Sequence, residues 1–104
     1  MSETVSFATC KDAAQAKKIA CALVKEKLAA CVNIVPGVTS VYTWDGKTEE
    51  AREVLLVIKS RRALSKRLVA RVRALHSYEV PELITIPIES GNPAYLRWVR
   101  ESTR

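Results

Sequence analysis

The chain has 104 residues, of which 48% are hydrophobic and 27% charged, which is the composition of one globular domain and excludes a disordered chain. Its formal net charge of +6 allows an anionic partner without identifying one. No signal peptide pattern and no run of about eighteen apolar residues occurs, so we expect a cytosolic protein that does not enter a membrane.

The amino-terminal part of the chain predicts a strand followed by an amphipathic helix. Residues 5–9 form a short β-branched and aromatic run, which is typical of a strand. Asp12 with Gln15 three residues later matches the N-cap of a helix, and apolar residues then recur at steps of three and four. We expect this helix to run to about Leu28, with Cys21 on or near its apolar stripe.

A long hairpin is predicted next. Residues 31–42 indicate a strand that is kinked or bulged at Pro36-Gly37, because proline cannot donate a hydrogen bond to a neighbouring strand. Asp45-Gly46 then predicts a tight turn, since both residues tolerate positive φ. The returning strand is clearest at 53–59, and its continuous apolar run is typical of a central strand covered on both faces.

The remaining chain predicts a second helix, an edge strand and a terminal helix. Ser60 is positioned to cap a helix whose apolar stripe spans 64–75, and a polar, proline-ended loop follows. Residues 83–88 indicate a strand, which Pro87 assigns to an edge of the sheet. Asn92 followed by proline predicts the capped start of the last helix.

This order of elements predicts one α+β domain over 1–104 with a ferredoxin-like βαββαβ fold, a long hairpin and an extra C-terminal helix. Two interleaved right-handed βαβ crossovers give a four-stranded antiparallel sheet with helices on one face. The run at 54–58 also places apolar side chains on the other face. Because a large exposed apolar face is unfavourable in a monomer, we infer that another subunit covers it.

Two common functions of this fold are disfavoured by the sequence. An RNA-recognition module needs exposed aromatic residues on a central strand, and the strand at 53–60 has none. A metal-chaperone domain carries CxxC in its first loop, whereas this loop reads TCKDAAQ with Cys10 alone. Most basic side chains lie opposite the apolar helix stripes, which favours solvated charges over nucleic-acid binding.

Four segments of the chain together resemble the CutA family of divalent-cation tolerance proteins. They are FATC (7–10), KLAACVNIVPGVTSVYTWDGK (27–47), ALHSYEVPEL (74–83) and GNPAYLRWV (91–99). The resemblance implies a PII-like homotrimer in which long hairpins extend across neighbouring subunits. It also implies a role in tolerance of copper or other divalent metals, without naming the molecular mechanism.

The candidate metal ligands are Cys31 and His76, because thiolate and imidazole donors suit copper and zinc. Some relatives build a metal site from a first-strand cysteine and two adjacent histidines, which match Ala8 and Leu75-His76 here, so only one of those donors is present. The alternatives are that Cys31 is a small buried residue and that His76 closes a hydrogen-bond network. For Cys10 and Cys21 we expect core packing.

A second candidate site is a polar and aromatic cleft between subunits, since ligand pockets favour interfaces. Its members are Trp44, Lys59, His76, Tyr78, Glu79, Glu82, Tyr95 and Trp98. The alternative is that the aromatic residues are packing anchors and that the glutamates pair with nearby basic side chains. Three functions stay open: a metal-linked trimeric binding protein, a PII-like sensor of a small molecule or partner protein, and, least supported, an enzyme, because no nucleophile is paired with a base.

Overall fold

The structure, a computed structural model, describes residues 2–104, so of the predicted domain only Met1 lies outside the described residues. The elements in chain order are β1 (Glu3–Cys10), α1 (Ala13–Lys25), β2 (Cys31–Trp44), β3 (Lys47–Arg61), the 3₁₀ turn η1 (Arg62–Leu64), α2 (Ser65–Leu75), β4 (Ile84–Pro87) and α3 (Pro93–Glu101). This order confirms the predicted ferredoxin-like fold with its long hairpin and C-terminal helix. None of the helices in the described part of the chain is long and apolar enough to cross a membrane.

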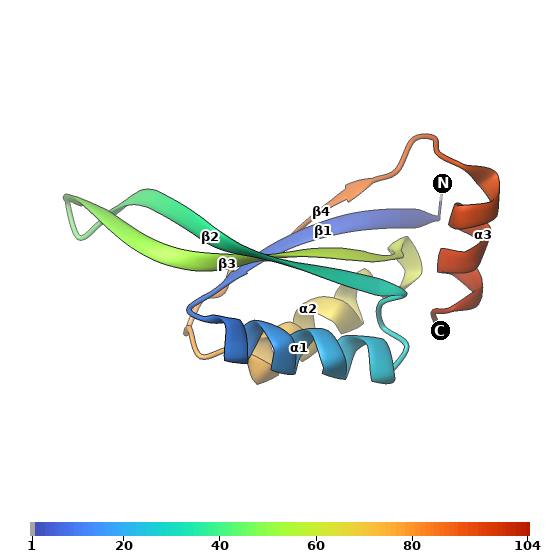
Figure 1. Ribbon diagram of the computed structural model, residues 1–104, viewed down its shortest axis with the longest axis horizontal. Coiled ribbons are helices and arrows are strands. Elements are labelled where there is room, and N and C mark those ends of the chain that lie inside the picture. Colours follow the sequence, from blue (N-terminus) through green and yellow to red (C-terminus); the bar gives the residue numbers. More distant parts are fainter. Residues whose placement is uncertain (1) are drawn as a thin grey trace.

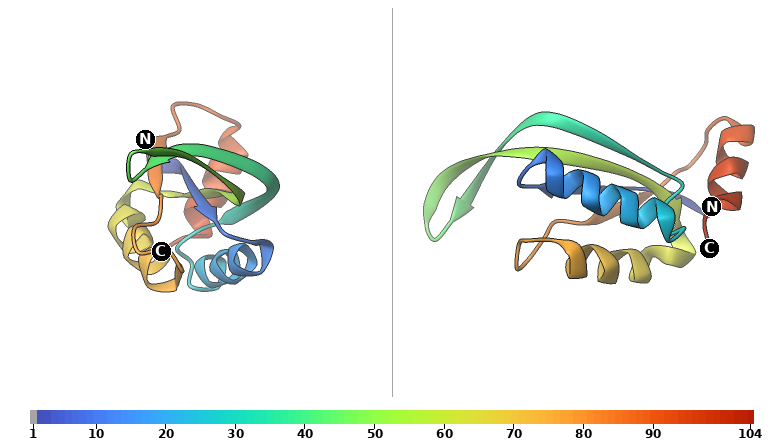
Figure 2. Two further views of the ribbon diagram at one scale, coloured as in Figure 1. Left: turned by 90° about the vertical axis from the view of Figure 1, so that its left-hand side faces the viewer. Right: turned by 60° about the horizontal axis from the view of Figure 1, so that its bottom comes forward.

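The sheet has four strands in the order β2-β3-β1-β4, and the strand pairs are antiparallel. β3 therefore lies in the interior of the sheet and β4 at an edge. Pro87, which has no N–H to donate, is tolerated in an edge strand because that strand has a neighbour on one side only. Helices α1 and α2 lie against one face of the sheet, and α3 packs at the end where β1 begins (Figure 1). Figure 2 shows that α1 and α2 run side by side beneath the strands.

The core lies between this face and the two helices. Alternate residues of each strand point to it, because successive side chains of a strand face opposite ways. Its largest fully buried side chains come from α1, β3 and α2, namely Ile19, Leu23, Leu56, Ile58, Leu68 and Val72. Ala8 and Cys10 of β1 are fully buried on the same face. The apolar stripes that predicted amphipathic helices are therefore the surfaces by which α1 and α2 pack against the sheet.

The hairpin of β2 and β3 extends beyond the body of the molecule (Figure 1). With the hairpin included, the molecule measures 45 × 25 × 23 Å. The register of the hairpin shifts between Val35 and Val38, as the Pro36-Gly37 pair predicted, and Gly37 has φ of +79°. At the turn, Asp45 and Gly46 both adopt positive φ, which confirms the predicted two-residue loop.

Helix α1 begins as predicted but ends earlier. The Asp12 side chain accepts a 2.8 Å hydrogen bond from the Gln15 N–H, so Asp12 is the N-cap. The helix stops at Lys25, because Lys27 turns into the left-handed region with φ of 61°. The N–H groups of Leu28 and Ala29 then both donate to the Leu23 carbonyl, which closes the helix while Leu28 still packs into the core.

The prediction that Ser60 caps the second helix is wrong. Ser60 belongs to β3 on the core side, and its hydroxyl donates a 2.6 Å hydrogen bond to the Leu28 carbonyl. The strand continues through Arg61, and η1 precedes α2 without a side-chain cap. At α3 the prediction holds, because the Asn92 side chain accepts a hydrogen bond from the Ala94 N–H and Pro93 is the first helical residue.

Candidate functional site

The sheet face opposite the helices, which we call the open face, is apolar over its centre. The register aligns five half-buried or exposed side chains there, on β1, β3 and β4: Val5, Phe7, Val57, Ile84 and Ile86. Ile84 and Ile86 are 57% and 51% exposed. The predicted site residues lie around this face in three separate groups.

The first group is at the start of β2, where Cys31 lies opposite Lys59 of β3. The Lys59 ammonium donates to the Asn33 side-chain oxygen and lies 4.0 Å from the Cys31 sulfur. Burial raises the pKa of Tyr95 of α3, and the charge of Cys31 makes a smaller contribution in the same direction. The rings of Tyr95 and Trp98 lie 5.6 Å apart and are both partly exposed.

The second group surrounds His76, which is nearly buried in the loop after α2. The Tyr78 N–H donates to His76 Nδ1 at 3.0 Å, so the ring proton lies on Nε2, which is 2.7 Å from the Thr9 carbonyl. Both ring nitrogens are therefore occupied by backbone groups. This arrangement is the hydrogen-bond network that the sequence left open as an alternative to metal binding.

Tyr78 extends this group towards the hairpin. Its hydroxyl donates a 2.8 Å hydrogen bond to Glu53 Oε2. Burial, followed by this hydrogen bond and the Glu53 charge, raises the pKa of Tyr78 to about 12. Glu82 accepts a longer hydrogen bond of 3.4 Å from the Thr9 hydroxyl, whereas Glu79 is exposed on the same loop.

Trp44 forms the third group by itself. It ends β2 at the tip of the hairpin, opposite Lys47, and is 72% exposed. Within one chain it lies apart from the other predicted cleft residues, so only a neighbouring subunit could add it to them.

Glu53, Thr9 and Asn33 are the site neighbours that sequence reasoning missed. Glu53 and Asn33 are strand residues whose partners are 25 and 26 residues away in sequence. Thr9 contributes its backbone carbonyl to His76. Glu53 and Asn33 could have been identified from the sequence as polar residues on the open-face side of their strands. Thr9 could not, because every residue has a backbone carbonyl and the sequence does not show which one accepts a hydrogen bond.

Cys31 and His76 lie towards opposite ends of β1. Cys31 aligns through Lys59 with Val5 of β1, whereas His76 contacts Thr9, four residues further along β1. That offset alone is about 13 Å at 3.3 Å per residue. Among residues 2–104, no three His, Cys, Asp or Glu side chains gather closely enough to hold a metal ion. One chain therefore does not bring the two predicted metal ligands together.

The three cysteines have different surroundings. Cys10 is fully buried, and desolvation, with smaller contributions from Glu53 and Asp12, raises the pKa of its thiol to about 11. Cys31 is half-buried. Cys21 is exposed on the outer flank of α1, so its predicted core packing is wrong: the buried stripe uses Ala16, Ile19, Ala20 and Leu23 and leaves position 21 to the side.

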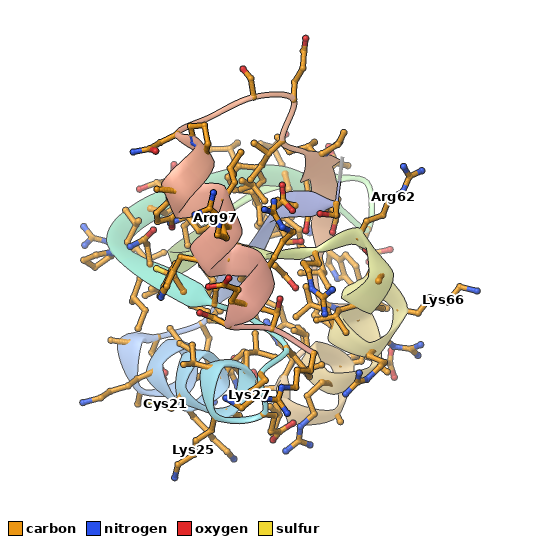
Figure 3. All side chains as sticks on the ribbon, turned by 90° about the vertical axis from the view of Figure 1, so that its right-hand side faces the viewer. Cys21, Lys25, Lys27, Arg62, Lys66 and Arg97 are labelled. Atoms are coloured by element: carbon orange, nitrogen blue, oxygen red, sulfur yellow. The ribbon has the colours of Figure 1, made fainter. Side chains whose placement is uncertain are left out.

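The basic side chains are distributed around the molecule. Figure 3 shows Lys25, Lys27, Arg62, Lys66 and Arg97 on or beside three helices, with Arg62 and Lys66 pointing away from the body. Arg71 pairs with Glu26 and Arg100 with Glu3. This distribution is what solvated charges would give.

The fold and the hairpin define an α+β protein of the ferredoxin-like class with an extended β2–β3 arm. The sequence model of the CutA1 divalent ion tolerance protein family matches residues 4–102. The chain therefore belongs to the CutA1 divalent ion tolerance protein family.

Individual relatives agree with this membership. The chain is 50% identical over 101 residues to the divalent-cation tolerance protein CutA of Thermus thermophilus, covering 97% of this chain and 98% of that protein. A solved structure from the same organism superposes with a TM-score of 0.96 at 49% identity, covering 98% of this chain and 99% of the other. The structure of CutA1 from Oryza sativa gives a TM-score of 0.98 at 46% identity, covering 100% and 95%.

Other relatives are longer than this chain. The mouse protein CutA is 49% identical over 102 residues, which are 98% of this chain but 58% of that protein. The chain likewise spans 64% and 57% of the frog and human relatives. A plant relative is named as chloroplastic and an archaeal structure as periplasmic, so the cytosolic location stays a prediction.

Proposed function

We propose that this protein acts in divalent-cation tolerance as a homotrimer, with the open face as the contact between subunits. The observation that carries the proposal is the apolar character of that face. Ile84, Ile86 and Val35 are 57%, 51% and 41% exposed in the single chain. Contiguous exposed apolar residues of this kind mark protein interfaces, because leaving them in water is unfavourable.

The hairpin supports the same assembly. Its outer half lies beyond the body and carries exposed Val41, Tyr42 and Trp44, which no element of the described chain covers. A neighbouring subunit within reach of this arm would cover these side chains. The assembly would also bring Trp44 close to site residues of another subunit, which one chain does not do.

Native mass spectrometry tests the assembly. We expect the wild-type protein to be trimeric at micromolar concentration and Ile86→Asp to be monomeric, because burying an unpaired carboxylate is costly. Val80→Asp is the matched control, since Val80 is an exposed apolar residue of the loop before β4. A monomeric wild type, or equal behaviour of the two variants, would contradict the proposal.

For the cation, we propose Cys31 as the accessible soft donor, with copper as the first metal to test. Its thiol is half-buried beside the open face, where a second subunit could add ligands. His76 could join only by releasing the Thr9 carbonyl or the Tyr78 N–H. The residues fit a site that is completed between subunits better than a site within one chain.

Copper uptake can be measured on the intact assembly with Cu(I), Cu(II) and Zn(II) added in turn. We expect one Cu(I) per subunit or per trimer, lost in Cys31→Ser and kept in Cys21→Ser, which removes an exposed thiol elsewhere. His76→Ala reports whether the imidazole contributes. Non-stoichiometric binding, or binding unchanged by Cys31→Ser, would contradict direct chelation of the metal by Cys31.

A second candidate is a PII-like sensor of a small molecule or partner protein. It is favoured by the Tyr95–Trp98 pair, whose rings lie 5.6 Å apart and partly exposed, because ligand pockets combine aromatic surface with a few polar groups. The sensor predicts metal-independent thermal stabilisation by its ligand, abolished by Trp98→Ala or His76→Ala without loss of the trimer. In either case we propose binding and not catalysis as the activity.

A further inference from the structure

A groove of about 540 Å³ lies away from every site described above, between α1 and the edge strand β2. Its apolar lining consists of Ala20, Cys21 and Val24 from α1 and Val32 and Ile34 from β2. Val32 and Ile34 align with Ile58 and Leu56, which face the helices. The groove is therefore on the helix side of the sheet and would stay free when another subunit covers the open face.

The groove exists because α1 carries a second apolar flank. The stripe that packs into the core includes Ile19 and Leu23, whereas Cys21 and Val24 lie to one side of it. Val24 and Ile34 remain 44% and 38% exposed, although both are apolar. Since strand β2 has no neighbour beyond it in the sheet, nothing in the described chain closes the groove on that side.

Both ends of the groove are positively charged. Lys17 and Lys25 line it together with the apolar residues, and neither makes a salt bridge within residues 2–104. They are eight residues apart on one helix, which corresponds to about 12 Å. An apolar floor between two free ammonium groups is complementary to an anion with an apolar chain.

We propose that this groove binds an amphiphilic carboxylate of the fatty-acid type, with its alkyl chain on the α1–β2 floor and its carboxylate at Lys17 or Lys25. The volume fits the usual range for small-molecule sites, about 300–1,000 Å³. The alkyl chain supplies burial of apolar surface, and the ammonium groups select the sign of the head group. This site is independent of the proposed cation and sensor sites.

Dodecanoate below its micellar concentration is the probe. We expect saturable binding by calorimetry, at one molecule per subunit with a Kd below about 1 mM. Dodecyltrimethylammonium has the same chain and the opposite charge, so we expect it to bind at least about fivefold more weakly. Equal binding of the two amphiphiles, or no saturable binding of dodecanoate, would overturn the proposal.

Variants locate the binding. Val24→Glu puts a carboxylate on the floor of the groove and should weaken dodecanoate binding at least about tenfold. Lys17→Glu and Lys25→Glu should each weaken it about fivefold, whereas Lys18→Glu, the same charge change on an exposed α1 residue outside the groove, should not. Binding that is insensitive to Val24→Glu, or equally sensitive to Lys18→Glu, would place the ligand elsewhere.

Cys21 gives an independent readout, because its thiol lines the groove. Bound dodecanoate should slow alkylation of Cys21 by a maleimide at least about threefold, as followed by peptide mass spectrometry. If Cys21 is instead protected without ligand and exposed only on dilution, the groove is a contact between copies of this chain. If an acidic partner peptide protects Cys21 and dodecanoate does not, the occupant is a protein segment. Either result would overturn the fatty-acid proposal.

Discussion

The hydroxyl of Tyr78 donates a hydrogen bond to Glu53, which ties the loop after α2 to β3, the returning strand of the hairpin. The same loop is held to β1 by His76, whose Nε2 donates to the Thr9 carbonyl. The rings of His76 and Tyr78 lie 4.7 Å apart. These contacts fix one end of the open face, so a change in either residue is transmitted to the base of the arm.

Tyr78→Phe is expected to lower the free energy of unfolding by about 1 kcal/mol, because Glu53 loses its donor in a partly buried place. Chemical unfolding measures the change. Tyr42→Phe is the control, since the Tyr42 hydroxyl makes no hydrogen bond within the described residues and its side chain is exposed. An effect of equal size in the two variants would contradict the role of the Glu53 contact.

The ionisation of Tyr78 gives a prediction for alkaline pH. Its pKa is raised from 10.0 to about 12, so the folded state favours the neutral phenol. The stability that this preference contributes is fully present below about pH 10 and is lost as the pH rises towards 12. Ultraviolet titration should show one tyrosine ionising near pH 12 that is missing in Tyr78→Phe. Ionisation of every tyrosine near pH 10 would contradict this assignment.

Thiol reactivity should follow exposure in the order Cys21, Cys31, Cys10. Burial raises the pKa of Cys10 to about 11, so almost no thiolate is present near neutral pH. Alkylation at pH 8 with peptide mapping checks the order, and unfolding in denaturant should make the three rates similar. Rapid labelling of Cys10 in the folded protein would show that this end of the core opens readily.

Two neighbouring leucines of β3 separate folding from assembly. Leu56 is fully buried against the helices, whereas Leu55 faces the open side. We expect Leu56→Ala to cost about 2–5 kcal/mol of unfolding free energy at any protein concentration. Leu55→Ala should instead make the Tm fall more steeply on dilution than in the wild type, because it weakens the proposed subunit contact. Identical responses to dilution would argue against an interface on this face.

Ser60→Ala should cost about 1–3 kcal/mol, because the Leu28 carbonyl loses its buried hydroxyl donor. Thermal or chemical unfolding measures the loss, with Ser90→Ala on an exposed loop as the control. If the two substitutions have the same small effect, water replaces the hydroxyl at this position.

The features that sequence predicted well are local in the chain. Asp12 and Asn92 cap helices through N–H groups two or three residues away, and Pro36-Gly37 produces its bulge by its own backbone chemistry. The order of strands follows from general rules of handedness and connection. These steps need no knowledge of distant parts of the chain.

The errors concern tertiary context. Ser60 has the residue type of a helix cap, but the strand continues past it and its hydroxyl finds a carbonyl 32 residues away. Cys21 directly follows the buried Ala20, but one residue step turns about 100° around the helix axis, which carries Cys21 past the edge of the buried stripe. The early end of α1 results from the left-handed backbone of Lys27, a residue type that seldom indicates such a turn.

For the candidate site, the residue types indicated which side chains take part in polar and aromatic contacts. They did not indicate which of these side chains lie next to one another. Lys59 and Cys31 do meet across two strands, and Tyr78 and His76 do pack together. Their main partners, however, include backbone groups and Glu53, which the sequence does not distinguish from other positions. Trp44 is separated from both groups because the hairpin carries it away from the body.

The position of β1 inside the sheet has a consequence for synthesis on the ribosome. This strand is made first, yet it pairs with β3 on one side and with β4, at Ile84–Pro87, on the other. At about 5–20 residues per second, roughly 4–15 s separate the end of β1 from the start of β4. During that interval β1 keeps an unpaired edge, whereas the hairpin can close within microseconds of leaving the ribosome. The nascent chain therefore presents a formed arm before its sheet is complete, and chaperone contact in the cell should be concentrated on β1.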